Sequence, residues 1–288
     1  MLWRCRDRVF DLTGRTLVMG IVNITPDSFS DGGRFFAPEA ALAHARRLVA
    51  EGADLLDLGA ESTRPGSQPV PDDEQWRRLA PVLAGLAGET PACLSVDTAS
   101  AAVAERALAA GAQIVNDVTA LGDPGMAGLV AGRGAGLVLM HMRGTPADMQ
   151  HDPRYQDAAS EVAARLAERL EAARAAGIAD ERVALDPGIG FGKAVRHSLE
   201  LVARLEALAA LGRPVLIGVS RKSFIGQVLD LPVGERLEGS LAATAVAVFN
   251  GARIVRTHAV AATVRAVRVA EALRGARDHG DRVKSPSP

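Results

Sequence analysis

The sequence predicts an α/β protein in which eight parallel strands close into a (β/α)8 TIM barrel. Short apolar, β-branched runs recur eight times along the 288 residues, and each precedes a helical pattern or a loop leading to one. The runs are apolar on both faces, as in a parallel sheet covered by helices. Eight such units in a chain of this length favour a closed barrel over the alternative, an open doubly wound sheet.

The expected strands are the eight apolar runs, in order Leu17–Ile24, Asp54–Gly59, Ala92–Val96, Gln113–Val118, Gly136–Met140, Val183–Asp186, Pro214–Val219 and Ala252–Val255. The expected helices have apolar residues at helical spacing. They are Glu39–Glu51, Asp73–Ala87, Ser100–Ala109, Ala158–Ala176, Ser198–Leu208, Leu241–Phe249 and Ala262–Leu273. Glycine often precedes the next strand, as at Gly52, Gly111 and Gly251, where it can end the preceding helix.

The two ends of the chain lie outside the repeating unit. Residues 1–16 precede the first expected strand, and we expect a hairpin-like extension that closes the bottom of the barrel. Residues 276–288, which end in Lys284-Ser285-Pro286-Ser287-Pro288, have the composition of a disordered tail. We therefore expect residues 1–275 to form a single domain.

Composition argues against several classes of function. The formal net charge of −1 provides neither a basic footprint for nucleic acid nor a polybasic patch for membranes. No apolar run is long enough to span a bilayer, and the first residues lack the apolar core of a signal peptide. The two cysteines and six histidines form no metal-binding motif. We expect a cytoplasmic protein whose partners are small molecules.

Polar residues gather at the carboxyl ends of the expected strands. In a barrel these ends meet on one face, where active sites lie. In order, the ends supply Asn23; Glu61-Ser62-Thr63-Arg64; Asp97; Asn116-Asp117; His141; Asp186; Ser220-Arg221-Lys222; Arg256 and His258. Any one of these residues could be an ordinary helix cap. A purely structural barrel, however, has no reason to carry polar groups at every strand end.

One part of this set suits a flat heterocycle. Asp97, Asn116 and Asp186 supply two carboxylates and an amide, and a carboxylate can accept two parallel hydrogen bonds from adjacent N–H donors. Lys222 adds a mobile ammonium donor. These residue types therefore predict a pocket for a nitrogen heterocycle.

Another part of the set suits an anion. Asn23, Arg256 and His258 could hold an anionic group, and the amide oxygen of Asn23 suits Mg²⁺. Arg64 and Arg221 add positive charge near the rim. The whole set therefore indicates an anionic, heteroaromatic substrate.

Two glycine-containing loops accompany these strand ends. The polar stretch Asn23–Gly33 has the composition of a functional loop on a rigid scaffold. Gly188–Lys193 resembles a nucleotide loop but fails the P-loop pattern, since Ala194 replaces the required Ser or Thr. It also fails the dinucleotide fingerprint, because Lys193 occupies the third glycine position. We expect a flexible loop that closes over a ligand, with Phe191 as a stacking wall.

Seven ordered motifs resemble the dihydropteroate synthases, a family of folate-pathway enzymes with a TIM-barrel fold. They are Met19–Gly33, Glu61–Gly66, Ser95–Thr98, Val115–Asp117, Asp186–Lys193, Ser220–Ser223 and Arg256–His258. The resemblance implies a transferase that condenses 6-hydroxymethyl-7,8-dihydropterin diphosphate with 4-aminobenzoate. The products are 7,8-dihydropteroate and diphosphate, and the diphosphate leaves by an SN1-like route.

The resemblance also implies a role for individual residues. The pterin-binding residues are Asp97, Asn116, Met140, Asp186, Phe191 and Lys222. The diphosphate-binding residues are Asn23, Thr63, Arg64, Arg256 and His258, with Mg²⁺ beside Asn23. The aminobenzoate-binding residues are Phe29, Thr63, Pro65, Arg221 and Ser223. The expected catalytic residues are Asp31, Lys222, Arg256 and His258. By the same resemblance we expect a homodimer and a sulfonamide target.

Two alternatives remain open. A pterin-dependent methyltransferase that acts with a corrinoid protein shares the barrel and the pterin-binding acids. It should lack the Thr25–Gly33 loop and the Ser220–Ser223 motif, which are both present here. A non-catalytic pterin-binding barrel would be expected to lose a site residue, and a rate assay separates it from an enzyme.

Overall fold

The computed structural model describes residues 1–25, 38–62, 67–145 and 148–280, and its strands confirm the expected barrel. Parallel strands close in the order β10-β3-β4-β5-β6-β7-β8-β9. Their bounds are β3 Leu17–Asn23, β4 Leu55–Gly59, β5 Cys93–Asp97, β6 Ile114–Asp117, β7 Gly136–Met140, β8 Val183–Asp186, β9 Val215–Ile217 and β10 Ala252–Thr257.

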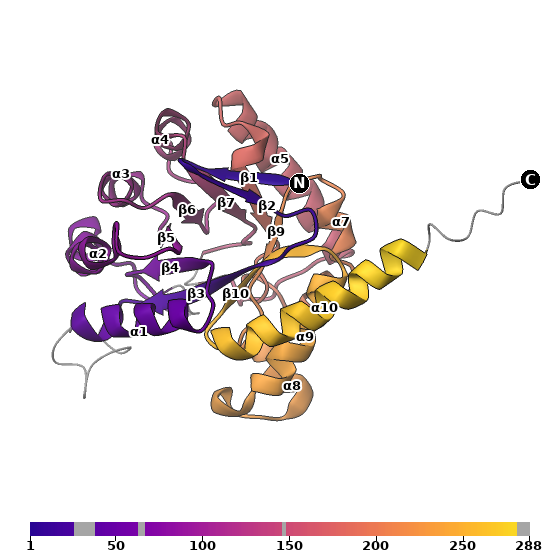
Figure 1. Cartoon of the computed structure of the whole chain (residues 1–288). Helices are drawn as coiled ribbons and strands as arrows, with labels where there is room; N and C mark the ends of the chain where they lie inside the picture. The colour runs from indigo at the N-terminus through magenta and orange to yellow at the C-terminus, as the bar shows by residue number, and fades with distance from the viewer. Residues whose placement is uncertain (26–37, 63–66, 146–147, 281–288) are drawn as a thin grey trace, which may run out of the picture.

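Helices surround the strands on the outside of the barrel (Figure 1). Their bounds are α1 Pro38–Ala50, α2 Asp72–Leu86, α3 Ala101–Ala109, α4 Met126–Arg133, α5 Ala158–Ala175, α6 Val195–Ala203, α7 Glu206–Ala209, α8 Ser223–Leu229, α9 Leu237–Phe249 and α10 Val260–Gly280, with short 3₁₀ turns at Asp180–Arg182 and Val233–Glu235. Within the described residues, no helix has both the length and the apolar character needed to cross a bilayer.

The structure corrects the boundary predicted for the C-terminal tail. Helix α10 continues beyond residue 275 to Gly280, so residues 276–280 are helical rather than disordered. Arg274 is buried and donates a hydrogen bond to the backbone oxygen of Val248. The guanidinium of Arg277 lies 4.4 Å from the centre of the Phe249 ring. These contacts with α9 hold the helix beyond Gly275, and residues 281–288 lie outside the described part.

Two further expectations about helices were incomplete. The single helix expected over Ser198–Leu208 is divided into α6 and α7. Helices α4 and α8 were not predicted, because each is short and lies directly after a polar loop. Neither difference alters the order of strands around the barrel.

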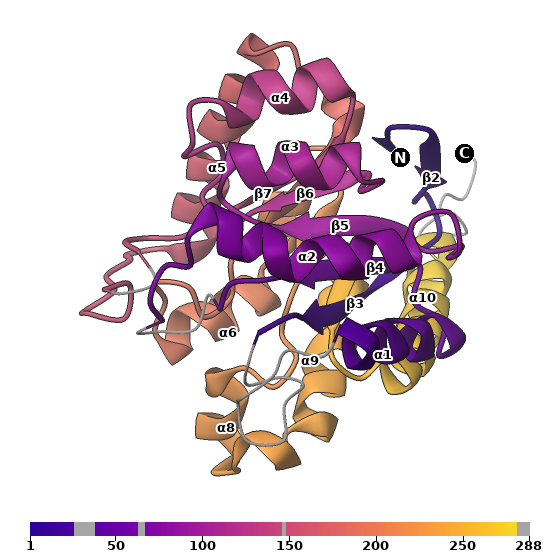
Figure 2. The same ribbon diagram turned by 90° about the vertical axis from the view of Figure 1, so that its left-hand side faces the viewer.

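An N-terminal hairpin closes one end of the barrel, as expected. Strands β1 (Leu2–Cys5) and β2 (Arg8–Asp11) pair antiparallel, and Figure 2 shows β2 at the right-hand end of the molecule. Trp3 is fully buried, and its indole nitrogen donates to the backbone oxygen of Arg182. It packs with side chains from the beginnings of the strands, including Leu17, Leu55 and Ile114.

Strand alternation separates an apolar layer from a polar layer inside the barrel. Side chains two residues apart point the same way along a strand. On β4, Leu55 contributes to the apolar cluster above the hairpin, and Asp57 follows it towards the carboxyl end. On β5, Cys93 belongs to the same apolar cluster, and Asp97 ends the strand. The polar groups therefore collect at the end of the barrel opposite the hairpin.

Candidate active site

The candidate active site is a cavity at the carboxyl ends of the strands. Eight residues predicted from the sequence line it together, namely Asp97, Asn116, Met140, Asp186, Phe191, Lys222, Arg256 and His258. They come from β5, β6, β7, β8 and β10 and from the loops after β8, β9 and β10. The barrel thus brings together residues that are far apart in the sequence, as the pattern of strand ends predicted.

A buried carboxylate below this cavity organises three of its neighbours. Asp57 on β4 is fully buried. Its Oδ1 accepts from the Ser95 hydroxyl at 2.6 Å, and its Oδ2 accepts from the Asn116 amide at 3.0 Å. Arg256 Nε also donates to Asp57 Oδ2 at 2.7 Å, and its Nη2 donates to Asp97 Oδ2 at 2.9 Å. The guanidinium of Arg256 therefore bridges the carboxylates of Asp57 and Asp97.

The sequence analysis missed Asp57. The signal was available, because Asp57 is the one acidic residue in the apolar run Leu55-Leu56-Asp57-Leu58-Gly59. It also lies two residues from Leu55, so both point into the barrel. Its position inside the strand, rather than at the strand end, is the reason it did not attract notice.

Asn116 is left with an unused acceptor. Its Nδ2 donates to Asp57, which fixes the orientation of the amide and directs Oδ1 elsewhere. Within the described residues, this buried Oδ1 has no hydrogen-bond partner. A buried polar atom without a partner is costly, so this oxygen is suited to accept from a ligand N–H group.

Burial changes the acidity of the site's charged groups. It raises the pKa of Asp97 to about 7, although the charge of Arg256 opposes the increase. The pKa of Asp186 is also raised by burial, against a hydrogen bond from the Gly188 backbone N–H. Burial lowers the pKa of Lys222 to about 8. Asp97 and Lys222 therefore exchange protons near neutral pH, as groups in functional sites often do.

Lys222 and His258 have defined partners. Lys222 Nζ donates to the backbone oxygen of Ile189 at 2.6 Å and lies 4.2 Å from the centre of the Phe191 ring. The Nδ1 of His258 lies 3.0 Å from the hydroxyl of Ser220. Ser220, one of the polar residues expected at the strand ends, therefore orients His258.

Other predicted residues do not line this cavity. Arg221 and Ser223 are exposed at the beginning of α8, on either side of Lys222. Asp117 points to the helix side of the barrel, where it accepts from the backbone N–H groups of Thr119 and Leu121. His141 is buried and contacts Lys193.

Five predicted site residues lie outside the described part of the chain. They are Phe29, Asp31, Thr63, Arg64 and Pro65. Asn23, the predicted metal ligand, ends β3 and is partly exposed. Over the described ranges, no group of three His, Cys, Asp or Glu residues is arranged to hold a metal. A single Asn oxygen still fits Mg²⁺, because this ion keeps several waters and is often completed by substrate phosphates.

Comparison with known proteins identifies related sequences. Residues 19–258 match the model of the pterin-binding enzyme family. Dihydropteroate synthase of Neisseria meningitidis serogroup C is 49% identical over 262 residues, which cover 89% of this chain and 92% of the relative. Dihydropteroate synthase of Escherichia coli K12 is 43% identical over 262 residues, which cover 91% of this chain and 93% of the relative.

Solved structures agree with the sequence matches. Dihydropteroate synthase of Yersinia pestis with a sulfonamide drug superposes with a TM-score of 0.90 at 43% identity, over 96% of this chain and all of the other. The Xanthomonas albilineans dihydropteroate synthase in complex with 7,8-dihydropteroate gives a TM-score of 0.85 at 44% identity. The match covers 95% of this chain and 99% of the other.

Proposed function

The chain belongs to the dihydropteroate synthases, a family of pterin-binding enzymes, and on this premise we propose the reaction that it catalyses. It condenses 6-hydroxymethyl-7,8-dihydropterin diphosphate with 4-aminobenzoate. The products are 7,8-dihydropteroate and diphosphate, so the protein is a transferase of folate biosynthesis.

The observation that carries this proposal is the buried Asn116 Oδ1, which has no hydrogen-bond partner in the described part of the chain and lies beside two buried acids. Asp97 and Asp186 line the same cavity and offer carboxylate oxygens to adjacent N–H groups. Lys222 supplies the opposite kind of group, a donor for a ring acceptor. Acceptors and a donor converging on one narrow cavity match the edge of a pterin ring better than they match a sugar or an aliphatic acid.

The charges around the cavity support loss of diphosphate as the first chemical step. The bond between the exocyclic methylene carbon and the diphosphate oxygen breaks, and its electron pair leaves with the diphosphate. Arg256 and His258 stabilise the charge that grows on the leaving group. The dihydropterin ring nitrogens and the neighbouring carboxylates stabilise the cation that remains, and Asp31 is a proposed contributor.

The second step forms the new carbon–nitrogen bond. The amine of 4-aminobenzoate donates its lone pair to the methylene cation, and the product nitrogen then loses a proton to solvent. The arylamine is a sufficient nucleophile, so no strong base is needed. Phe29, Thr63, Pro65, Arg221 and Ser223 are the proposed aminobenzoate-binding residues. Closure of the loops over the site would keep water from capturing the cation.

Mg²⁺ is proposed to bind the diphosphate together with Asn23. Thr63 and Arg64 complete the proposed set around the diphosphate. When bound, the ion would neutralise charge on the leaving group. The single amide oxygen of Asn23 supports a site that substrate oxygens and water complete.

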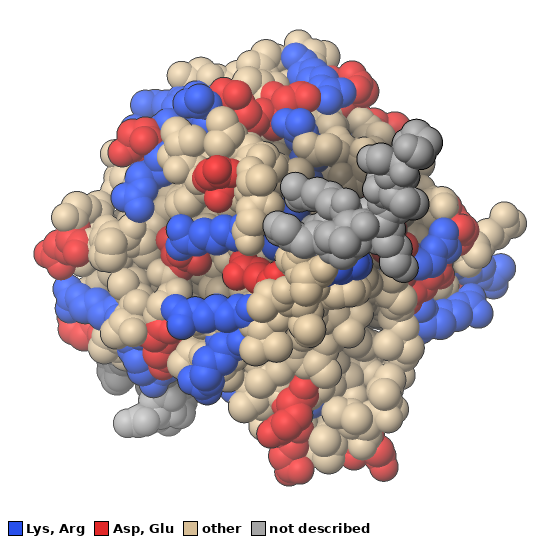
Figure 3. Space-filling model, turned by 45° about the vertical axis from the view of Figure 1, so that its right-hand side comes forward, with Lys and Arg blue, Asp and Glu red and all other residues tan. Residues whose placement is uncertain are grey.

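We also propose a cytoplasmic homodimer. Cys5 and Cys93 are both free thiols buried in the barrel, which fits a reducing compartment. Val246 on α9 and Val269 and Leu273 on α10 are exposed apolar side chains that support a contact surface between two copies. In Figure 3 residues other than Lys, Arg, Asp and Glu form most of the lower part of the visible face, where α8 and α9 lie.

A diphosphate-release assay with the purified protein, Mg²⁺ and the pterin diphosphate tests the reaction. We expect release that depends on 4-aminobenzoate, formation of 7,8-dihydropteroate, and loss of activity when EDTA removes Mg²⁺. Tight pterin binding without release would contradict the proposal. That result would favour a binding protein or a methyltransferase-like role.

A further inference from the structure

The loop between β8 and α6 contributes two residues to the cavity at the carboxyl ends of the strands, which we call the pterin cavity. Ile189 and Phe191 both line the cavity. The backbone oxygen of Ile189 accepts from Lys222 Nζ at 2.6 Å, and the Phe191 ring lies 4.2 Å from the same nitrogen. The position of this loop therefore determines where the Lys222 ammonium lies.

The loop has little means of fixing its own conformation. Three of its residues are glycines with positive φ, namely Gly188, Gly190 and Gly192. Glycine visits many backbone conformations, so a glycine-rich loop loses much conformational entropy when it becomes ordered. Side-chain contacts must therefore supply the order.

Three side chains on the far side of the loop donate to its carbonyl groups. Lys193 Nζ donates to the oxygen of Phe191 at 2.9 Å. The Tyr155 hydroxyl donates to the oxygen of Gly192 at 3.1 Å, and Gln150 Nε2 donates to the oxygen of Gly190 at 2.6 Å. Three carbonyl groups of one loop are thus held by donors that do not line the pterin cavity.

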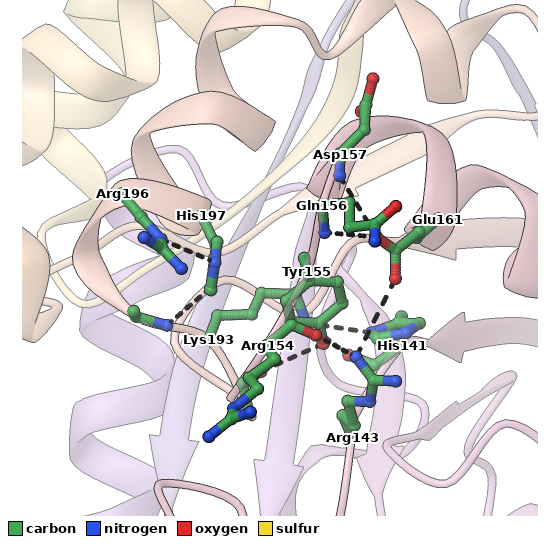
Figure 4. A network of polar contacts seen from close by, with 12 residues as sticks. His141, Arg143, Arg154, Tyr155, Gln156, Asp157, Glu161, Lys193, Arg196 and His197 are labelled. Carbon is green, nitrogen blue, oxygen red and sulfur yellow. Dashed lines mark hydrogen bonds and ion pairs between the residues drawn. The ribbon is translucent and has the colours of Figure 1, made fainter. Parts of the chain in front are cut away.

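Lys193 is the buried member of this group. Its side chain is 4% exposed, and Nζ also lies 3.2 Å from the backbone oxygen of His141 and 3.0 Å from its Nδ1. Figure 4 shows the side chain extending beside the Tyr155 ring towards His141. The three protons of the ammonium thus have three acceptors.

The surroundings of the Lys193 ammonium are unusual, because a buried cation is normally paired with a carboxylate. Among the described residues, the hydrogen-bond partners of the Lys193 ammonium are all uncharged, and the charge that raises its pKa is that of Asp186. Burial lowers its pKa to about 7, and burial with the Lys193 charge lowers the pKa of His141 to about 3. The neutral imidazole can therefore accept a hydrogen bond. Burying an ammonium that is hydrogen-bonded only to neutral acceptors costs folding free energy. An apolar side chain at this position would fill the space at a lower cost.

We propose that Lys193, Tyr155 and Gln150 form a clamp that positions the Gly188–Gly192 loop, and through it Phe191 and Lys222, for pterin binding. Lys193 is its central positioning residue. The inference rests on the proposed function and deepens it, because it assigns a role to side chains behind the pterin cavity.

Lys193→Met tests the clamp, since methionine keeps an unbranched side chain one atom shorter and removes the donors. We expect the KM for the pterin diphosphate to rise about tenfold, while the KM for 4-aminobenzoate and kcat change less than threefold. Tyr155→Phe removes one hydroxyl and keeps the ring, so it should raise the same KM about threefold. Arg154→Ala is the matched control. Its side chain pairs with Asp152 and contacts no carbonyl of the loop, so its kinetics should be unchanged.

The outcomes separate the clamp from the reaction itself. An unchanged pterin KM in Tyr155→Phe would overturn the clamp, and so would an unchanged pterin KM in a folded Lys193→Met. A loss confined to kcat would overturn it as well. Thermal unfolding checks that each variant folds. If Lys193→Met does not fold, the pterin KM of Tyr155→Phe decides the test. If the wild-type protein itself makes no dihydropteroate, the proposed function fails instead.

Discussion

Asp57 links three residues that come from different strands. It accepts from Ser95 on β5, from Asn116 on β6 and from Arg256 on β10. An acceptor with this many donors fixes the amide orientation that leaves Asn116 Oδ1 available to a ligand. The pterin cavity therefore depends on a carboxylate that lies beneath it.

Asp57→Asn should lower kcat/KM for the pterin diphosphate about 100-fold, because it replaces charge-assisted hydrogen bonds with neutral ones. The expected loss follows from the release of Arg256 and from a less fixed Asn116. Steady-state kinetics measure the effect, with Asp73→Asn on the exposed side of α2 as a control. A kcat/KM within threefold of the wild-type value would show that Asp57 does not organise the site.

The pKa of Asp97 predicts how pterin binding depends on pH. Burial raises this pKa to about 7, so the carboxylate gains a proton as the pH falls through 7. A protonated acid can no longer accept two hydrogen bonds, so the affinity should fall about tenfold between pH 8 and pH 6. Calorimetry with 6-hydroxymethylpterin measures this without the titration of a diphosphate.

Asp97→Asn is the control for this pH dependence. The variant should bind the pterin weakly and should lose most of the change between pH 8 and pH 6. Asp186 lines the same cavity, and burial raises its pKa as well. Full retention of the pH dependence in Asp97→Asn would show that another group of the cavity titrates instead of Asp97.

At the residue scale, sequence reasoning found the residues at strand ends and missed those that support them. Asp97, Asn116 and Asp186 end their strands, where barrel topology makes a shared cavity predictable. Asp57 and Lys193 act through contacts with residues far away in the sequence. The acid inside the apolar strand was a local signal for Asp57, but the partners of both residues follow from the three-dimensional register of the barrel, which no local pattern reveals.

At the scale of elements, the strands were predictable and the ends of helices were less so. Gly136–Met140 and Val183–Asp186 match their expected bounds, because continuous apolar runs define buried parallel strands. Helix α10 extends past its expected end because Arg274 and Arg277 contact α9. In an isolated sequence these arginines resemble solvated residues before a tail.

The loop after β8 provides a prediction at this scale. Gly188 has φ near +64°, and a Cβ there would overlap the backbone oxygen of His141. Gly188→Ala should therefore destabilise the protein by about 3 kcal/mol and raise the KM for the pterin diphosphate. Urea unfolding and steady-state kinetics measure the two effects.

Gly177→Ala is the matched control for backbone strain. Gly177 also has a positive φ, but a Cβ there would meet no atom within 4 Å. This change should cost only about 1 kcal/mol and leave the KM unchanged. Equal destabilisation in the two variants would mean that the contact with His141 is unimportant.

On the scale of the whole molecule, the residues that stabilise the fold at the hairpin lie at the opposite end of the barrel from the residues of the cavity. The hairpin and the apolar cluster around Trp3 occupy the end where the strands begin, and the cavity lies at the other end. The closed order of strands was predictable from eight repeated units, whereas the packing of the hairpin depends on contacts such as that between Trp3 and Arg182. Changes at the hairpin end should therefore affect folding more than catalysis.

Trp3→Ala tests this separation, because Trp3 is the largest fully buried side chain of the hairpin. The cavity that it leaves should cost about 4 kcal/mol and lower the Tm by roughly 10 °C. At 20 °C the folded variant should keep a kcat/KM within twofold of the wild-type value, since the apolar cluster around Trp3 and the lining of the pterin cavity share no residue. Trp3→Phe retains most of the buried area and should lose less than half as much stability. A large loss of kcat/KM at temperatures where Trp3→Ala is fully folded would instead mean that the hairpin influences the geometry of the site across the length of the barrel.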